Sequence, residues 1–105
     1  MDTNALITIL NREIRDNFPD FTGIWFIGSR SRGESRTDSD YDFVFTFAHQ
    51  PDWREKNKLY DIIAEVEVRE QIVIDGKAYG EKELKTIWTP FREKVLKEGF
   101  FYDAA

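Results

Sequence analysis

The stretch GSRSRGESRTDSDYDFVFTF, residues 28–47, mixes glycine, serine, arginine and acidic side chains and then turns strongly hydrophobic. From Tyr41 to Phe47 aromatic side chains occupy every second position. Because successive side chains of a strand point to opposite faces, the aromatic row faces one way while Asp42 and its alternating neighbours face the other. This pattern predicts a strand with its aromatic side in the core and Asp42 on the opposite side.

Two aspartates stand at the start of this predicted strand. Asp40 and Asp42 project from the same face, with Cα atoms about 6 to 7 Å apart. Two carboxylates at that separation repel by roughly 2 kcal/mol at an effective dielectric constant of ~20. A positive group is therefore expected between them. An arginine of the same loop or a bound hard cation such as Mg²⁺ meets that need.

A phosphate-binding turn is predicted just upstream of the acidic pair. The apolar segment TGIWFIG, residues 22–28, is typical of a strand buried on both faces. Gly28 and Ser29 follow it, where the backbone N–H groups of a tight turn can point at a phosphate. Arg30 and Arg32 add charges suited to triphosphate oxygens. The stretch is thus interpreted as a phosphate cradle followed by a metal-binding pair.

The rest of the chain alternates helical and strand patterns. Helices are predicted over residues 4–17, over 53–66 behind a capping box at Asp52 and Glu55, and from Pro90 to a stop at Gly99. A third strand is expected in REQIVIDG, residues 69–76, ending in an Asp75–Gly76 turn. VIDGKAY alternatively forms one arm and the turn of a hairpin. The segment FFYD, residues 100–103, is expected to return as an edge strand, after a short acidic turn at residues 81–84.

This order predicts one domain over residues 1–105 of the α/β (α+β) class, with a small mixed β-sheet flanked by helices. The chain has no cysteine, which excludes disulfides and thiolate sites and favours a cytoplasmic protein. Its N-terminal apolar run is short and interrupted by charge, so neither a signal peptide nor a membrane anchor is expected. A net charge of −5 argues against an extended non-specific nucleic-acid surface.

GSRSRGESRTDSDYDF resembles the signature of the DNA polymerase β-type nucleotidyltransferase superfamily: Gly-Ser, a spacer of about ten residues, then Asp-x-Asp before a hydrophobic strand. It is most similar to the minimal nucleotidyltransferases, which commonly read Gly-Ser-x-Ala-Arg-Gly and Ser-Asp-x-Asp-Leu. Here Ser31 replaces the frequent Ala and Phe43 the frequent Leu. The resemblance is firm over residues 24–47 and weaker over PFREKVLKEG.

The resemblance implies a polymerase β-like fold and Mg²⁺-dependent transfer of a nucleoside monophosphate from ATP or another NTP, with release of pyrophosphate. Asp40 and Asp42 would hold two Mg²⁺ ions, while Gly28 and Ser29 would bind the triphosphate, helped by Arg30 and Arg32.

The family's site also uses a third carboxylate on the neighbouring strand, which acts as both a metal ligand and a catalytic group. Glu70, placed at the start of the EQIVID strand, is preferred narrowly over Glu67 at the end of the preceding helix. Asp75 is interpreted as a turn residue.

Three functions are compatible with this resemblance. The first is an active nucleotidyltransferase that modifies a hydroxyl of a protein or RNA partner, as small members of the family do when they act as antitoxins of HEPN-domain toxins. The second is a non-catalytic antitoxin that binds its partner and keeps the fold. Antibiotic-modifying nucleotidyltransferases rank third, because they usually carry a further helical domain.

Overall fold

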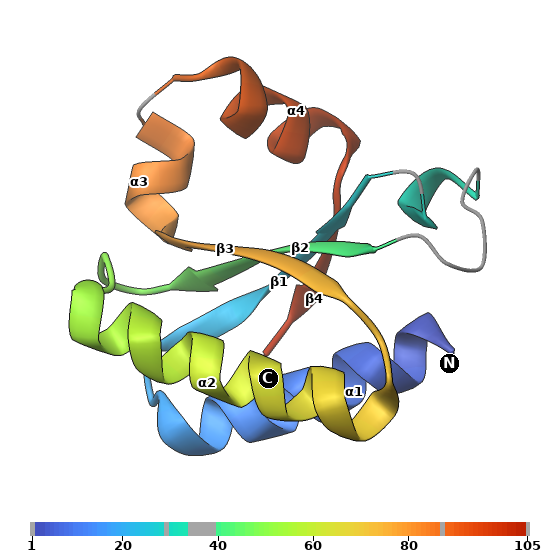
Figure 1. Cartoon of the computed structure of the whole chain (residues 1–105). Coiled ribbons are helices and arrows are strands. Elements are labelled where there is room, and N and C mark those ends of the chain that lie inside the picture. Colours follow the sequence, from blue (N-terminus) through green and yellow to red (C-terminus); the bar gives the residue numbers. More distant parts are fainter. Residues whose placement is uncertain (1, 29, 34–39, 87, 105) are drawn as a thin grey trace.

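The computed structural model describes residues 2–28, 30–33, 40–86 and 88–104. Four strands form one mixed sheet in the order β3-β2-β1-β4, in which β2 and β3 are parallel and the other neighbours are antiparallel (Figure 1). The elements are α1 (Thr3–Asn17), β1 (Phe21–Ile27), the 3₁₀ turn η1 (Arg30–Arg32), β2 (Tyr41–Phe47), α2 (Trp53–Glu70), β3 (Ile74–Gly80), α3 (Glu81–Thr86), α4 (Pro90–Glu98) and β4 (Phe100–Asp103).

The main core lies between the sheet and the helices α1 and α2, which together cover one face (Figure 1). The alternation of β2 is confirmed: its aromatic row is buried on this face. The rings of Phe18 and Phe21 pack on Phe47 with centroids 5.4 Å away in both cases. Aliphatic side chains at helical spacing fill the rest of this core, namely Leu6, Leu10 and Ile14 of α1 and Leu59, Ile63 and Val66 of α2.

Helices α3 and α4 lie on the opposite face of the sheet (Figure 1). A smaller core joins them to the sheet through Val44, Leu84 and Val95, all buried. The guanidinium of Arg92 lies 4.7 Å from the ring centroid of Tyr79 and 3.7 Å from the Glu83 carboxylate. These contacts hold α4 against α3 and β3, above the side of β2 that carries Asp42.

The predicted helices and the edge strand are largely confirmed. The capping box of Asp52 and Glu55 starts α2, and Thr89 caps α4 by accepting a hydrogen bond from the Arg92 N–H. The FFYD segment is β4, which pairs with β1 at the edge of the sheet. Side chains of α1 hold the end of β4 and the next residue in place, because Asn11 donates a hydrogen bond to the Asp103 carbonyl and Arg15 donates one to the Ala104 carbonyl.

A third strand is present, but its predicted bounds were wrong. Helix α2 continues to Glu70 and ends at Gln71 in the left-handed conformation, so β3 begins only at Ile74. The Asp75–Gly76 pair lies inside β3, which excludes the hairpin. The ring of Phe45 packs under Gly76, where a Cβ atom would lie 2.8 Å from a ring carbon. Gly76 thus serves close packing within the sheet. The acidic turn expected near residues 81–84 is the helix α3.

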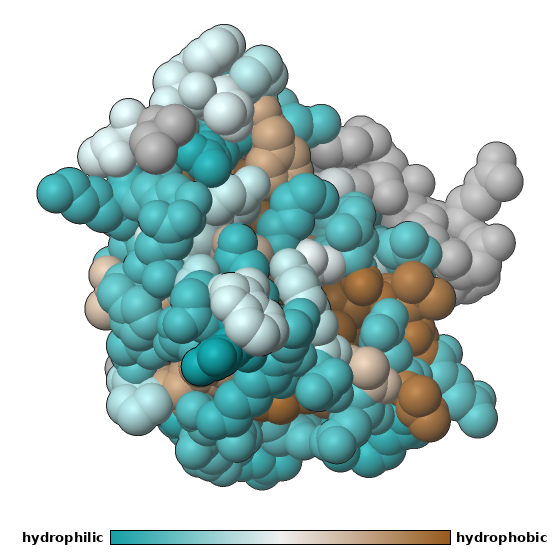
Figure 2. Space-filling model, turned by 60° about the vertical axis from the view of Figure 1, so that its left-hand side comes forward, coloured by the Kyte–Doolittle hydropathy of each residue, from teal (hydrophilic) through white to brown (hydrophobic). Residues whose placement is uncertain are grey.

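The face seen in Figure 2 is mostly hydrophilic, and hydrophobic residues appear in a few smaller areas. Charged residues make up 33% of the sequence, which agrees with this view. No helix in the described part of the chain combines the length and the apolar character that crossing a bilayer requires.

A histidine clasp, formed by His49 with Asp20 and Glu55, joins two loops to the start of α2. The Nδ1 atom of His49 lies 2.5 Å from Asp20 Oδ2, and Nε2 lies 2.9 Å from Glu55 Oε2. The pKa of His49 is raised above its ordinary value, first by the hydrogen bond to Glu55 and then by the charges of Asp20, Glu55 and Asp52. The protonated imidazole therefore favours the folded chain.

The clasp predicts a pH-dependent stability difference between the wild type and His49→Gln. A histidine whose pKa is raised on folding stabilises fully below its unfolded pKa of about 6.5, and this contribution disappears as the pH rises through the folded-state pKa. Urea unfolding should show a larger deficit for His49→Gln at about pH 5.5 than at about pH 9. An equal deficit at both pH values would contradict this role of His49.

Candidate active site

A glycine turn leads out of β1 into the site. Gly28 has φ of +83°, in the left-handed region that favours glycine. Its carbonyl accepts hydrogen bonds from the N–H of Ser31 at 3.2 Å and from the Ser31 hydroxyl at 2.7 Å. A Cβ atom at Gly28 would collide with the Asp42 carboxylate. The absence of a side chain at Gly28 therefore lets the turn and Asp42 lie against each other.

Asp42 faces Asp75 across the parallel pair of strands. In the register of β2 and β3 these residues are direct partners, one pair inward from Tyr41 and Ile74. Neighbouring strands lie about 4.8 Å apart, so the two carboxylates repel by about 1 to 3 kcal/mol between bulk-water and protein-surface dielectric constants. Asp75, which the sequence analysis interpreted as a turn residue, thus shares one face of the sheet with Asp42.

Several effects raise the pKa of Asp42. Partial burial contributes most, followed by the charges of Asp75 and Asp40, and a side-chain hydrogen bond with Asp75 acts in the same direction. The ammonium of Lys77 opposes them and favours the carboxylate form. A half-buried carboxylate surrounded by like charge is typical of sites that bind a cation or handle a proton.

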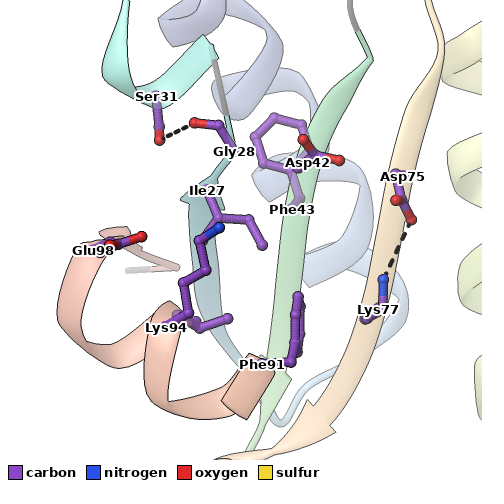
Figure 3. A pocket seen from close by; sticks show the side chains of 11 residues that line it. Ile27, Gly28, Ser31, Asp42, Phe43, Asp75, Lys77, Phe91, Lys94 and Glu98 are labelled. Atoms are coloured by element: carbon purple, nitrogen blue, oxygen red, sulfur yellow. Dashed lines mark hydrogen bonds and ion pairs between the residues drawn. The ribbon is translucent and has the colours of Figure 1, made fainter.

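The two aspartates border a pocket of about 180 Å³ between the sheet and α4. Figure 3 shows Asp42 and Asp75 on the adjacent strands β2 and β3, with the Gly28 turn beside Asp42. Lys77 lies on β3 two residues beyond Asp75, and a dashed line joins the two side chains. The facing wall belongs to α4 and consists of Phe91, Lys94, Val95 and Glu98. The pocket thus combines an acidic pair on the sheet with lysines and a partly apolar wall on α4.

The structure brings some of the predicted site residues together. Gly28 and Asp42 line the pocket, and Asp40 lies exposed just before β2, close enough for its charge to act on Asp42. The guanidinium of Arg30 lies 4.1 Å from the ring centroid of Tyr41. Ser29 and the side chain of Arg32 fall outside the described part of the chain, so their proposed contacts with phosphate stay predictions.

The structure does not place Glu70 where the prediction put it. Glu70 is the last residue of α2 and lies 3.8 Å from Arg69, while the strand position opposite Asp42 belongs to Asp75. Glu67, the second candidate, accepts a hydrogen bond from the N–H of Ile74 at 2.9 Å and so ties the end of α2 to the start of β3. The geometry therefore favours Asp75 as the third carboxylate.

Sequence reasoning missed Asp75 because it interpreted Asp-Gly as a turn. The alternation of IDGKAYG contained the necessary signal: Ile74, Gly76 and Ala78 share one face, and Asp75 and Lys77 share the other. The pocket wall supplied by α4 had no signal of its own, since Phe91, Lys94 and Glu98 look like an ordinary amphipathic pattern.

The carboxylates of Asp42 and Asp75 suit a cation whose remaining ligands come from the substrate. Among the described residues, no group of three or more His, Cys, Asp or Glu side chains is arranged to hold a metal ion. Asp42 and Asp75 nevertheless offer two facing carboxylates whose repulsion a cation would relieve. Mg²⁺ is usually held in this manner, by one or two carboxylates together with water and substrate phosphates. The residues therefore fit Mg²⁺ bound with a nucleotide better than Mg²⁺ in a closed protein cage.

Residues 9–99 match the model of the family described as Polymerase beta, Nucleotidyltransferase. This match spans most of the chain and includes the Gly28 turn, Asp42 and Asp75. The protein therefore belongs to the polymerase β-type nucleotidyltransferase family. No curated protein matches its sequence.

Solved structures show the same fold at low sequence identity. A chain of a toxin–antitoxin complex with AMP-PNP has a TM-score of 0.67 and 21% identity, covering 100% of this chain and 73% of its own. A proposed nucleotidyltransferase from Sulfolobus solfataricus has a TM-score of 0.61 and 18% identity, and the match covers 93% of this chain and 79% of that chain. A chain of a complex between a tri-AMPylated Shewanella oneidensis HEPN toxin and an MNT antitoxin has a TM-score of 0.55 and 18% identity. The match covers 93% of this chain and 71% of that chain. These likenesses confirm the predicted fold.

Two glycines of the turn provide a matched test of its geometry. Gly28 and Gly33 both have positive φ, +83° and +72°, but only Gly28 has a side chain in the space that a Cβ would take. Gly33→Ala should lower the free energy of unfolding by about 1 kcal/mol through backbone strain alone. Gly28→Ala should cost clearly more and displace Asp42. Equal costs in urea unfolding would show that Asp42 does not pack against Gly28.

Proposed function

We propose that the protein is a nucleotidyltransferase that transfers a nucleoside monophosphate, AMP from ATP in the first instance, to a hydroxyl group of a protein partner. The observation that carries the proposal is the juxtaposition of Asp42 and Asp75 beside the Gly28 turn, in the lining of one pocket. Family membership supports the reaction class. The AMP-PNP complex and the AMPylated complex among the structural neighbours favour an adenine nucleotide.

The reaction is a displacement at the α-phosphorus of the NTP. The acceptor hydroxyl oxygen forms a bond to this phosphorus, the bond to the pyrophosphate oxygen breaks, and the hydroxyl proton passes to a carboxylate or to water. Asp75 is the preferred proton acceptor, because it is half exposed at the pocket and faces Asp42. Bound Mg²⁺, held by Asp42 and Asp75 with Asp40 at the rim, would neutralise the charge of the phosphates.

Positioning accounts for most of what the chain contributes. The Gly28 turn brings the backbone next to Asp42, so that phosphate oxygens bound at the turn would lie beside the carboxylates. Ser29 stays a candidate for a triphosphate contact, while Ser31 closes the turn through its hydroxyl group. The wall formed by α4 limits the access of water to one side of the pocket.

Exposed aromatic side chains favour a protein partner. Trp88 is 69% exposed, and Phe100 and Phe101 on the edge strand are 54% and 42% exposed. Aromatic residues of this kind are enriched in protein interfaces. The neighbouring toxin–antitoxin complexes suggest a HEPN-type toxin, whose RNA is a further acceptor. The exposed aromatic residues are equally compatible with the alternative function, a non-catalytic antitoxin that neutralises its partner by binding.

Two variants test which acidic residue completes the site. Asp75→Asn should lower AMP transfer from labelled ATP by about 100-fold, equivalent to roughly 2.7 kcal/mol of transition-state stabilisation. Glu70→Gln, which also removes one carboxylate, should retain nearly full activity because Glu70 lies at the end of α2. The opposite ranking of the two variants would restore Glu70 as the third carboxylate.

Mass spectrometry of a co-expressed HEPN-type partner separates the enzyme from the binder. The wild type should add the mass of one or more nucleotides to the partner, and the Asp40→Ala, Asp42→Ala double variant should add none. Transfer that persists in the double variant would refute the roles of Asp40 and Asp42. Toxin neutralisation by the double variant, with no mass increment in either sample, would instead support the non-catalytic antitoxin.

A further inference from the structure

The contacts of Lys77 join both walls of the pocket. Its Nζ atom lies 3.7 Å from Asp75 Oδ1 and 4.9 Å from the ring centroid of Phe91 on α4. Strand alternation places Lys77 and Asp75 on the same face of β3, the face that also carries Asp42 from β2. The backbone thus directs this ammonium group toward the acidic pair (Figure 3).

The electrostatics of the pocket explain why a cation is favoured at this position. Asp42 and Asp75 face each other, Asp40 adds a third negative charge nearby, and Glu98 lies on the α4 wall. Lys94 also lies on that wall, but it belongs to α4 and not to the strands that carry the two aspartates. The ring of Phe91 attracts the Lys77 ammonium through its negative face, so this side chain is held from two directions.

We propose that Lys77 is the counter-ion of the Asp42–Asp75 pair, a positioning residue that holds the two carboxylates together in the metal-free protein and weakens the binding of free divalent cations. This role rests on the proposed function, because the cation that Lys77 opposes is the one that would arrive with the nucleotide. A cation bound to triphosphate carries negative oxygens with it, which Lys77 attracts. The residue would therefore favour the metal–nucleotide complex over the metal alone.

A first experiment measures this role without any metal or activity. In EDTA, Lys77→Met should lower the melting temperature by about 2 to 5 °C, since a partly exposed ion pair contributes little. In the Asp75→Asn background the same substitution should have almost no effect, because its main partner is gone. Lys85→Met on the exposed side of α3 is the control with the same change of net charge. Equal effects of Lys77→Met in both backgrounds would overturn the proposal.

A second experiment measures the affinity for Mn²⁺ by titration calorimetry without nucleotide. Lys77→Met should bind Mn²⁺ about three- to tenfold more tightly than the wild type, because one repelling charge is removed near a divalent ion. Lys85→Met should bind Mn²⁺ like the wild type. Unchanged or weaker binding by Lys77→Met would overturn the proposal, and a loss of ATP affinity in EDTA with unchanged Mn²⁺ affinity would make Lys77 a phosphate ligand instead.

The two experiments also separate this proposal from the proposed function. If no variant and no wild-type sample binds Mn²⁺ with or without ATP, the proposed reaction fails. The melting temperatures in EDTA still decide whether Lys77 acts as the counter-ion, because they require only the charges of the protein itself.

Discussion

The parallel pairing of β2 with β3 is the constraint on which the rest of the molecule depends. It sets Asp42 opposite Asp75, and through strand alternation it buries the aromatic row of β2 on the other face. A shift of the register by one residue would exchange the faces, exposing the aromatic rings and burying the carboxylates. The free energy of burying these rings therefore also maintains the arrangement of the acidic pair.

Glycine at two positions makes this pairing compatible with close packing. Gly76 leaves space under β3 for the Phe45 ring, and Gly28 leaves space at the end of β1 for the Asp42 carboxylate. The first contact belongs to the core and the second to the site. Both contacts involve a residue of β2, Phe45 in the first and Asp42 in the second. The strand therefore connects the packing of α1 and α2 on one face to the candidate site on the other.

Much of the fold was predictable from local patterns. The alternation in residues 41–47, the capping box before α2 and the Thr-Pro start of α4 all specify their elements by short-range physics. The bounds of the third strand were not predictable in this way, since Asp-Gly favours a turn in isolation. Only the pairing with β2 places Asp75 and Gly76 inside a strand. Tertiary contacts outweighed local preference there, and the misplaced strand led the sequence analysis to prefer Glu70 over Asp75. The α4 wall, with Lys94 and Glu98, depends on packing that no motif encodes.

In the proposed function, the Gly28 turn and the Asp42–Asp75 pair form one metal–nucleotide site. A crystal structure with Mn²⁺ and a non-hydrolysable ATP analogue, in which anomalous scattering locates the ions, tests it most directly. We expect an ion at the carboxylates of Asp42 and Asp75, with phosphates at the Gly28 turn. An ion at Glu67 or Glu70, or a nucleotide bound away from the turn, would contradict it.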